Sequence, residues 1–155
     1  MNPQQKEAIL TLLEIDKNNG GYQNKYWFPY KDFLDPADNF TDFSCENLGG
    51  KQRYLSVINH LLTKDETAKI YVEVYGFEAD HNEPIIYADT LIIFSRLSLE
   101  EVRQTFNEPN DIFPSDIGEF TEPSQQISLV DHDGNLVSGD KLWDDSHSVY
   151  YCWWD

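Results

Sequence analysis

The chain has 155 residues, a length that fits one domain over residues 1–155, and its 28 acidic and 11 basic side chains give a formal net charge of −17. A surface this negative repels nucleic acid and anionic lipid and attracts basic proteins. Hydrophobic residues make up 40 % of the chain and aromatic residues 14 %, which excludes a disordered acidic polypeptide because such chains are poor in aromatic residues.

Two helices are predicted in the first half of the chain. Asn2 can cap a helix that begins at Pro3, with Gln5 in the position of a capping-box partner, and the glycines at 20–21 end it. A second helix is predicted over Lys51–Lys64, because its apolar residues recur at helical spacing. The residues on that shared face are Tyr54, Leu55, Ile58, Leu61 and Leu62.

Strands predominate after the second helix. Residues 69–78 alternate as in a strand with one face in the core. The side chains expected on one face are Ile70, Val72 and Val74, and those on the other are Tyr71, Glu73 and Tyr75. Residues 85–95 form a second strand, whose apolar run at 91–94 is typical of burial on both faces. A turn at Asp80–Glu83 is predicted between the two strands.

A capping box predicts a third, short helix. Ser98 and Glu101 have the spacing of that motif, and the apolar pattern continues over residues 99–106. A loop divided by Pro109, Pro114 and Pro123 is predicted over Glu108–Ser124. Ile127–Val130 is then predicted as a strand, and Asp133-Gly134 indicates a tight hairpin turn after it.

A final strand is predicted over Val149–Trp154, apolar on both faces and placed inside the sheet. The helices are few, and the strands are joined largely by short turns. The order of elements therefore predicts an α+β fold, a mainly antiparallel sheet with two to three helices packed on one face.

Three local patterns invite a catalytic or metal-binding interpretation. Asp131–Asn135 is rich in calcium-binding residue types, but counting from Asp131 puts Leu136 where an EF-hand loop needs glycine, so a hairpin turn is favoured. Asp144–His147 holds carboxylates, a hydroxyl and an imidazole, but no nucleophile elbow surrounds Ser146, and a solvated turn is favoured. With 28 acidic residues, a carboxylate pair suited to glycoside hydrolysis is expected by chance. We predict no catalytic residue, no metal site and no cofactor.

The cysteines and the chain start favour a cytoplasmic protein. Cys45 and Cys152 do not make a disulfide framework. The sequence shows no secretory signal, and no apolar run reaches the roughly 18 to 20 residues that span a bilayer. We therefore expect reduced thiols, with Cys152 a small buried residue, and a Cys45–Cys152 bridge as the alternative.

Two segments combine aromatic and acidic side chains and are the candidate partner-binding surfaces. Tyr26–Phe43 belongs to a stretch, residues 22–50, without a clean period, and Glu108–Glu122 carries five acidic residues with apolar ones between them. Tyr and Trp are enriched among residues that dominate binding energies, and carboxylates steer a basic partner. The alternative is that the aromatics cover the core and the acids keep the surface soluble. The predicted contact residues are Trp27, Tyr30, Asp32, Asp35, Glu108, Asp111, Phe113, Asp116, Glu119 and Glu122.

Residues 104–155 hold one basic residue, Lys141, against eleven acidic ones. In its size, its acidity and its lack of a catalytic motif, the whole chain resembles the acidic immunity proteins of bacterial toxin–immunity systems. The resemblance implies a non-enzymatic inhibitor that occludes the active site of a basic toxin, such as a nuclease, without binding nucleic acid or membrane, and it carries over no individual residues. Two alternatives stay open: a nucleic-acid mimic of the anti-restriction or anti-defence kind, and an enzyme or small-ligand-binding protein without a readable motif.

Overall fold

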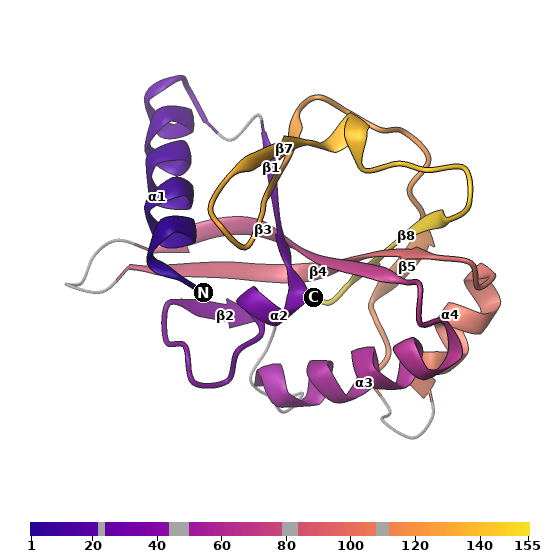
Figure 1. Ribbon diagram of the computed structural model, residues 1–155. Coiled ribbons are helices and arrows are strands. Elements are labelled where there is room, and N and C mark those ends of the chain that lie inside the picture. The colour runs from indigo at the N-terminus through magenta and orange to yellow at the C-terminus, as the bar shows by residue number, and fades with distance from the viewer. Residues whose placement is uncertain (22–23, 44–49, 79–83, 108–111) are drawn as a thin grey trace.

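An eight-stranded sheet with four helices forms the part of the chain that the computed structural model describes, residues 1–21, 24–43, 50–78, 84–107 and 112–155 (Figure 1). The helices are α1 (Pro3–Asn18), α2 (Tyr30–Phe33), α3 (Gly50–Lys64) and α4 (Leu99–Asn107), with a 3₁₀ turn, η2, at Gly139–Lys141. The strands are β1 (Lys25–Pro29), β2 (Thr41–Phe43), β3 (Lys69–Glu78), β4 (Ile85–Ser95), β5 (Asp116–Glu119), β6 (Ile127–Val130), β7 (Leu136–Ser138) and β8 (Ser148–Trp153).

The strands lie in the order β5-β8-β4-β3-β1-β6-β7, and β2 pairs with β4. β1 runs parallel to β6 and β2 runs parallel to β4, whereas the other pairs among the described strands are antiparallel. The expected α+β class is therefore confirmed. Figure 1 shows α3 and α4 below the long strands β3 and β4, and the segment that carries β7 and leads to the start of β8 above them.

Short-range signals in the sequence determine where α1 and α4 begin. Asn2 Oδ1 accepts the Gln5 N–H at 2.9 Å, and the Gln5 side chain accepts the Asn2 N–H at 3.2 Å, which completes the predicted capping box of α1. Ser98 and Glu101 make the same reciprocal pair before α4. Each box satisfies backbone donors that the first helical turn leaves without a partner.

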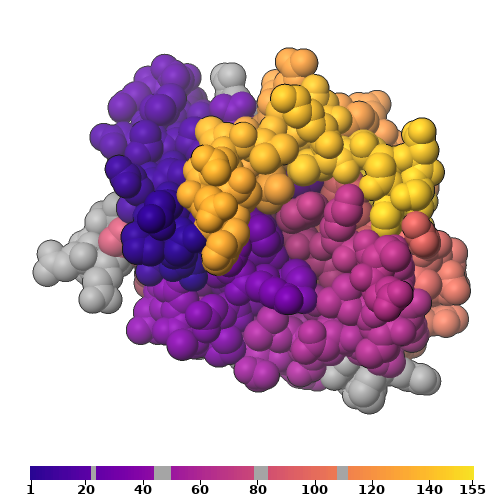
Figure 2. Space-filling view, in the orientation of Figure 1, coloured from indigo at the N-terminus to yellow at the C-terminus, as the bar shows by residue number. Residues whose placement is uncertain are grey.

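The predicted hairpin joins β6 to β7. The Asp131 carboxylate accepts the N–H groups of Asp133 and Asn135, and Gly134 has a φ of 83°, which favours glycine. A Cβ on Gly134 would also lie 2.8 Å from the backbone of Gln4. The hairpin tip lies against the start of α1, as Figure 2 shows at the contact between orange and indigo atoms.

The sheet buries side chains on both faces. All four helices contribute to the larger cluster, which includes Ile9, Phe33, Tyr54, Ile58, Leu61, Val102 and Phe106. Along β4, Leu91 and Ile93 point into this cluster, whereas Ile92 and Phe94 point into a smaller one on the opposite face. The prediction that residues 91–94 are buried on both faces is therefore confirmed, because all four are at most 1 % exposed.

Two stretches that were predicted as irregular contain strands. Residues 22–50 hold β1, the single helical turn α2 and β2, and the segment Glu108–Ser124 holds the short edge strand β5. β1 has no polar alternation because Tyr26 and Phe28 enter one cluster and Trp27 enters the other. A strand covered on both faces lacks the period-2 signal on which the prediction depended.

The final strand was predicted inside the sheet, and β8 does lie between β4 and β5. Its Cys152 is fully buried, as expected, and burial raises the pKa of the thiol. Cys45 and the predicted Asp80–Glu83 turn lie outside the described residues. In the described part of the chain, no helix has both the length and the apolar character needed to cross a membrane.

Candidate functional site

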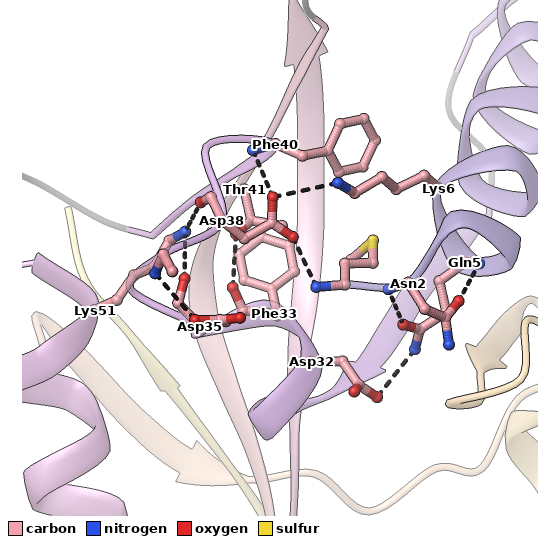
Figure 3. A network of polar contacts seen from close by, with 12 residues as sticks. Asn2, Gln5, Lys6, Asp32, Phe33, Asp35, Asp38, Phe40, Thr41 and Lys51 are labelled. Atoms are coloured by element: carbon pink, nitrogen blue, oxygen red, sulfur yellow. Dashed lines mark hydrogen bonds and ion pairs between the residues drawn. The ribbon is translucent and has the colours of Figure 1, made fainter.

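The acidic residues predicted to bind a partner near α2 instead contact other parts of this chain (Figure 3). Asp32 accepts a hydrogen bond from Gln5 Nε2 at 3.0 Å and pairs with His132 Nδ1 at 2.8 Å. Asp35 is exposed, and its carboxylate accepts the N–H of Ala37 at 3.0 Å. Asp32 therefore links α2 to α1 and to the hairpin, whereas Asp35 contacts only its own turn.

Asp38 completes this network and contacts two positively charged groups, the Met1 amine and Lys6. Its carboxylate lies 2.7 Å from the Met1 amine and 3.4 Å from Lys6 Nζ, and it accepts the N–H of Phe40 at 2.9 Å. Burial acts to raise the pKa of Asp38, but the Met1 amine and the Phe40 N–H outweigh burial and lower that pKa. The Lys51 ammonium donates to the Asp38 carbonyl. The negative charge here is therefore largely compensated within the chain.

Trp27 is a core residue, which corrects its prediction as a partner-binding anchor. Its indole is 0 % exposed, lies 5.9 Å from the ring of Trp143 and donates to Glu73 Oε2 at 2.7 Å. Tyr30 is half-buried at the start of α2, with the Lys31 ammonium 6.0 Å from its ring centre. The Trp27 ring is therefore not free to form the centre of an interface.

The second predicted segment supplies exposed residues at one edge of the sheet. Asp116 and Glu119 are exposed on β5, Glu122 is exposed just beyond it, and Phe113 is 48 % exposed. Three strands separate β5 from β1, so the two predicted segments do not meet in one site. The predicted residues that lie outside the described part of the chain are Glu108 and Asp111.

The face of the sheet opposite the helices is covered at one end and open at the other. The paired residues that cross this face on β1, β3, β4, β8 and β5 are Trp27, Glu73, Thr90, Trp153 and Asp116. At the Trp27 end, Phe120 and Trp143 pack over the strands. At the other end, Trp153 is 36 % exposed.

We name the open part the aromatic–acidic face. Its residues are Asp42, Glu73, Tyr75, Glu78, Tyr87, Asp89, Asp116, Tyr151 and Trp153. Three of its aromatic side chains each donate a hydrogen bond to a carboxylate. The pairs are Tyr87 with Glu78 at 2.8 Å, Trp153 with Asp89 at 3.0 Å and Tyr151 with Asp116 at 3.1 Å.

Tyr75 is the most exposed ring on this face. It is 59 % exposed and stacks on Tyr87, with the ring centres 6.3 Å apart and the planes 28° apart. Burial, together with the charges of Asp89 and Asp42, raises the pKa of Tyr75. The hydrogen bond to Glu78 is the main cause that raises the pKa of Tyr87. Negative charge therefore surrounds rings that are open to a partner.

Most carboxylates of this face differ from Asp38 in the donors that hold them. A phenol O–H or an indole N–H fixes a carboxylate in place without neutralising it, whereas an ammonium group does both. Lys25 brings one positive charge to the face, with its Nζ 3.2 Å from Glu73 Oε1. Because the face holds five carboxylates and Lys25 pairs with one of them, the face keeps a strong negative field.

Two hollows lie along this face. The first, about 390 Å³, is lined by Lys25, Glu73, Thr90, Ile92, Asp116, Phe120, Tyr151 and Trp153. The second, about 490 Å³, shares Lys25 and Phe120 with the first and has Glu119 and Glu122 in its wall. The structure thus brings three predicted acids, Asp116, Glu119 and Glu122, to the border of the aromatic–acidic face.

The Asp144–His147 segment does not have the arrangement of a catalytic triad. Ser146 Oγ and Asp144 Oδ1 both lie near the same imidazole nitrogen of His147, Nδ1, at 3.0 and 2.8 Å. The other nitrogen faces the hydroxyl and carbonyl of Thr67. A triad needs the serine and the carboxylate on opposite nitrogens. Within the described ranges, no group of three or more potential metal-binding side chains occurs either.

The predictions missed Glu73, Tyr75 and Trp153 as candidate contact residues, although part of the signal was visible. The alternation of β3 places Glu73 and Tyr75 on the side away from the core. What the sequence could not show is that β8 brings Trp153 beside them, because this depends on pairing between distant strands. Comparison of the chain with protein-family models, with curated proteins and with solved structures found no match.

Proposed function

We propose that this protein is an inhibitor that binds a basic protein through the aromatic–acidic face, acting as an immunity protein that occludes the active site of a basic toxin. The observation that carries the proposal is a sheet face whose carboxylates are held mainly by neutral donors beside exposed rings. Tyr75 and Trp153 supply those rings, at 59 % and 36 % exposed.

The physical roles of the two kinds of side chain are different. The uncompensated carboxylates steer a basic protein to the face, and complementary charge can raise association rate constants to on the order of 10⁸ M⁻¹s⁻¹ at low salt. Aromatic side chains such as Trp153 then slow dissociation by burying area in the centre of the interface. The Tyr and Trp hydrogen bonds hold both kinds of group in place before binding, which lowers the entropic cost of association.

A toxin that acts on nucleic acid fits this face chemically. Its active site must bind phosphate, so it presents cationic side chains that carboxylates can occupy instead. The net charge of −17 makes direct binding of the chain to nucleic acid unfavourable. Inhibition by occupation of a cationic site therefore needs no catalytic group on this protein.

The test is affinity capture from the source cell at low and high salt, followed by co-expression with the captured protein. The bait variant Asp89→Lys/Asp116→Lys changes the face, and Glu7→Lys/Glu14→Lys, on exposed positions of α1, gives the same change in net charge. We expect a basic, toxic partner that the wild type and the α1 variant capture and neutralise, and that the face variant does not. Capture of no basic protein, or equal neutralisation by both variants, would contradict the proposal. A captured protein blocked in a nucleic-acid-binding groove rather than an active site would favour the nucleic-acid-mimic alternative.

A further inference from the structure

Lys25 shows how the first hollow of the aromatic–acidic face accommodates a cation. Its ammonium lies 3.2 Å from Glu73 Oε1 and 5.6 Å from the centre of the Phe120 ring. A carboxylate and an aromatic face both attract an organic cation. The Lys25 side chain is also half exposed, at 52 %, so it does not fill or seal the hollow.

The opposite wall of the hollow offers the same two groups without a cation. Asp116 accepts one hydrogen bond, from the Tyr151 hydroxyl to Oδ2 at 3.1 Å, and Oδ1 accepts none among the described residues. Trp153 lies next to Asp116 in the register of β5 and β8 and is 36 % exposed. A carboxylate oxygen and a ring are therefore open side by side.

We infer that this hollow receives an arginine side chain of the basic partner, an inference that rests on the proposed function. The guanidinium binds the Asp116 carboxylate and lies against the rings of Trp153 and Tyr151, across the hollow from the Lys25 ammonium. Arginine is favoured over lysine because its planar guanidinium donates in two directions and stacks on aromatic rings. A volume of about 390 Å³ is ample for one such side chain.

Charge argues against the other occupants of an open sheet face. A second copy of this chain would bring another −17 of net charge to a negative surface. An anionic lipid surface or a nucleic acid is repelled for the same reason. A cationic protein side chain is the occupant that both the carboxylates and the rings favour.

Replacing Lys25 should strengthen arginine binding, and this direction of change is a specific test of the inference. Its ammonium shares the hollow with the incoming guanidinium, and like charges repel. Lys25→Gln should therefore tighten binding of arginine, by about two- to fivefold for a partly exposed charge. Lys17→Gln, on an exposed position of α1, makes the same change in net charge far from the hollow and should leave binding unchanged.

The experiment is an NMR titration of the intact protein with Nα-acetyl-arginine amide, in which the indole N–H resonance of Trp153 is assigned with the Trp153→Phe variant. Nα-acetyl-citrulline amide, neutral and nearly isosteric, is the control ligand. We expect a saturable shift of the Trp153 resonance with the arginine compound and none with the citrulline compound. Asp116→Asn should weaken binding by about two- to fivefold, and Asp145→Asn, on an exposed position elsewhere, should not change it.

Equal shifts with both ligands, or equal weakening by Asp116→Asn and Asp145→Asn, would overturn the arginine assignment. The capture experiment fails or succeeds independently of this titration. If the face variant abolishes neutralisation of a captured toxin but arginine does not bind, the proposed function stands and this inference falls. If arginine binds but capture yields no basic partner, the proposed function falls.

Discussion

Two tryptophans at opposite ends of one sheet face have the same hydrogen-bonding chemistry and different surroundings. Trp27 donates to Glu73 at 2.7 Å and is 0 % exposed, whereas Trp153 donates to Asp89 at 3.0 Å and is 36 % exposed. The difference is the chain segment after β5, which places Phe120 and Trp143 against Trp27 and leaves Trp153 uncovered.

Because of this difference, we expect the covered end to contribute mainly to stability and the open end to contribute mainly to partner binding. At the covered end, removing Trp27 from water contributes to folding, and its N–H needs Glu73 because a buried donor without a partner is costly. At the open end, Trp153 contributes less to folding because water still reaches it. The pair of Trp153 and Asp89 contributes little to stability and lies on a strongly charged face. This arrangement is expected of a surface that binds a partner.

The largest effect is expected from removing the end of β8, which carries Trp153 on the open face and Trp154 in the core. Deleting residues 151–155 removes half of β8 and the buried Trp154, which packs on Phe43, Tyr54 and Phe106. The lost burial should exceed the roughly 5 to 15 kcal/mol that is typical of the total stability of a domain, so the truncated chain should not fold. Thermal unfolding followed by circular dichroism tests this, and an unchanged melting transition would contradict the placement of β8.

The two tryptophans can be compared directly by single substitutions. Trp27→Ala should lower the free energy of unfolding by about 3 to 5 kcal/mol, because it leaves a cavity and removes the hydrogen-bond donor of Glu73 Oε2. Trp153→Ala should lower it by less than about 1 kcal/mol. Urea unfolding of both variants measures the difference, and equal losses would remove the distinction between the covered and open ends.

A buried carboxylate provides a third test, because Asp65 also accepts hydrogen bonds from neutral donors but is only 7 % exposed. Burial acts to raise its pKa, but the donors from Thr67, Arg96 and Ser95 outweigh it and lower the pKa from 3.8 to about 2. A depressed folded-state pKa stabilises the protein above the unfolded-state value, and this stabilisation is lost as the pH falls through the folded-state value. The wild type should therefore lose about 2 kcal/mol between about pH 4 and pH 2 through this group.

The matching variants are Asp65→Asn, which should lose most of this pH-dependent component, and Asp116→Asn, which should keep it because Asp116 is exposed on β5. Urea unfolding at several pH values between about 2 and 6 measures both. If Asp65→Asn kept the pH dependence of the wild type, as Asp116→Asn should, Asp65 would not be the group responsible.

A small effect on stability, similar to that of Trp153→Ala, is expected at Gly118. A Cβ there would lie 2.7 Å from the Tyr151 hydroxyl, so Gly118→Ala should push that side chain away from Asp116 at a cost of less than about 1 kcal/mol. Binding of the partner should weaken, because the ring and the carboxylate lose their fixed arrangement. Gly76→Ala is the control, since a Cβ at Gly76 meets nothing within 4 Å. Comparable binding by the two variants would show that this hydrogen bond does not matter for recognition.

Much of the fold was predictable because its signals are local. The capping boxes at Asn2 and Ser98 and the alternation of β3 depend on residues a few positions apart, and they indicated the α+β class. β1 was missed because both of its faces are covered, which removes the alternation of a half-buried strand. The short strands β2 and β5 were missed because they show no such alternation either, and their pairing with distant strands leaves no local signal. The candidate site was predicted in part for the same reason. The acids of β5 were visible in the sequence, whereas the hydrogen bond between Trp153 and Asp89 joins residues 64 positions apart.

The central claim is that the open end of this sheet face, and not acidity in general, binds the partner. The most direct measurement is the association rate constant with the captured basic protein at low salt, for the wild type, for Asp89→Lys/Asp116→Lys and for Glu7→Lys/Glu14→Lys. We expect the face variant to associate at least about tenfold more slowly and the α1 variant to change by less than about twofold. Equal slowing by both variants would mean that net charge alone governs the encounter and would contradict the assignment of this face.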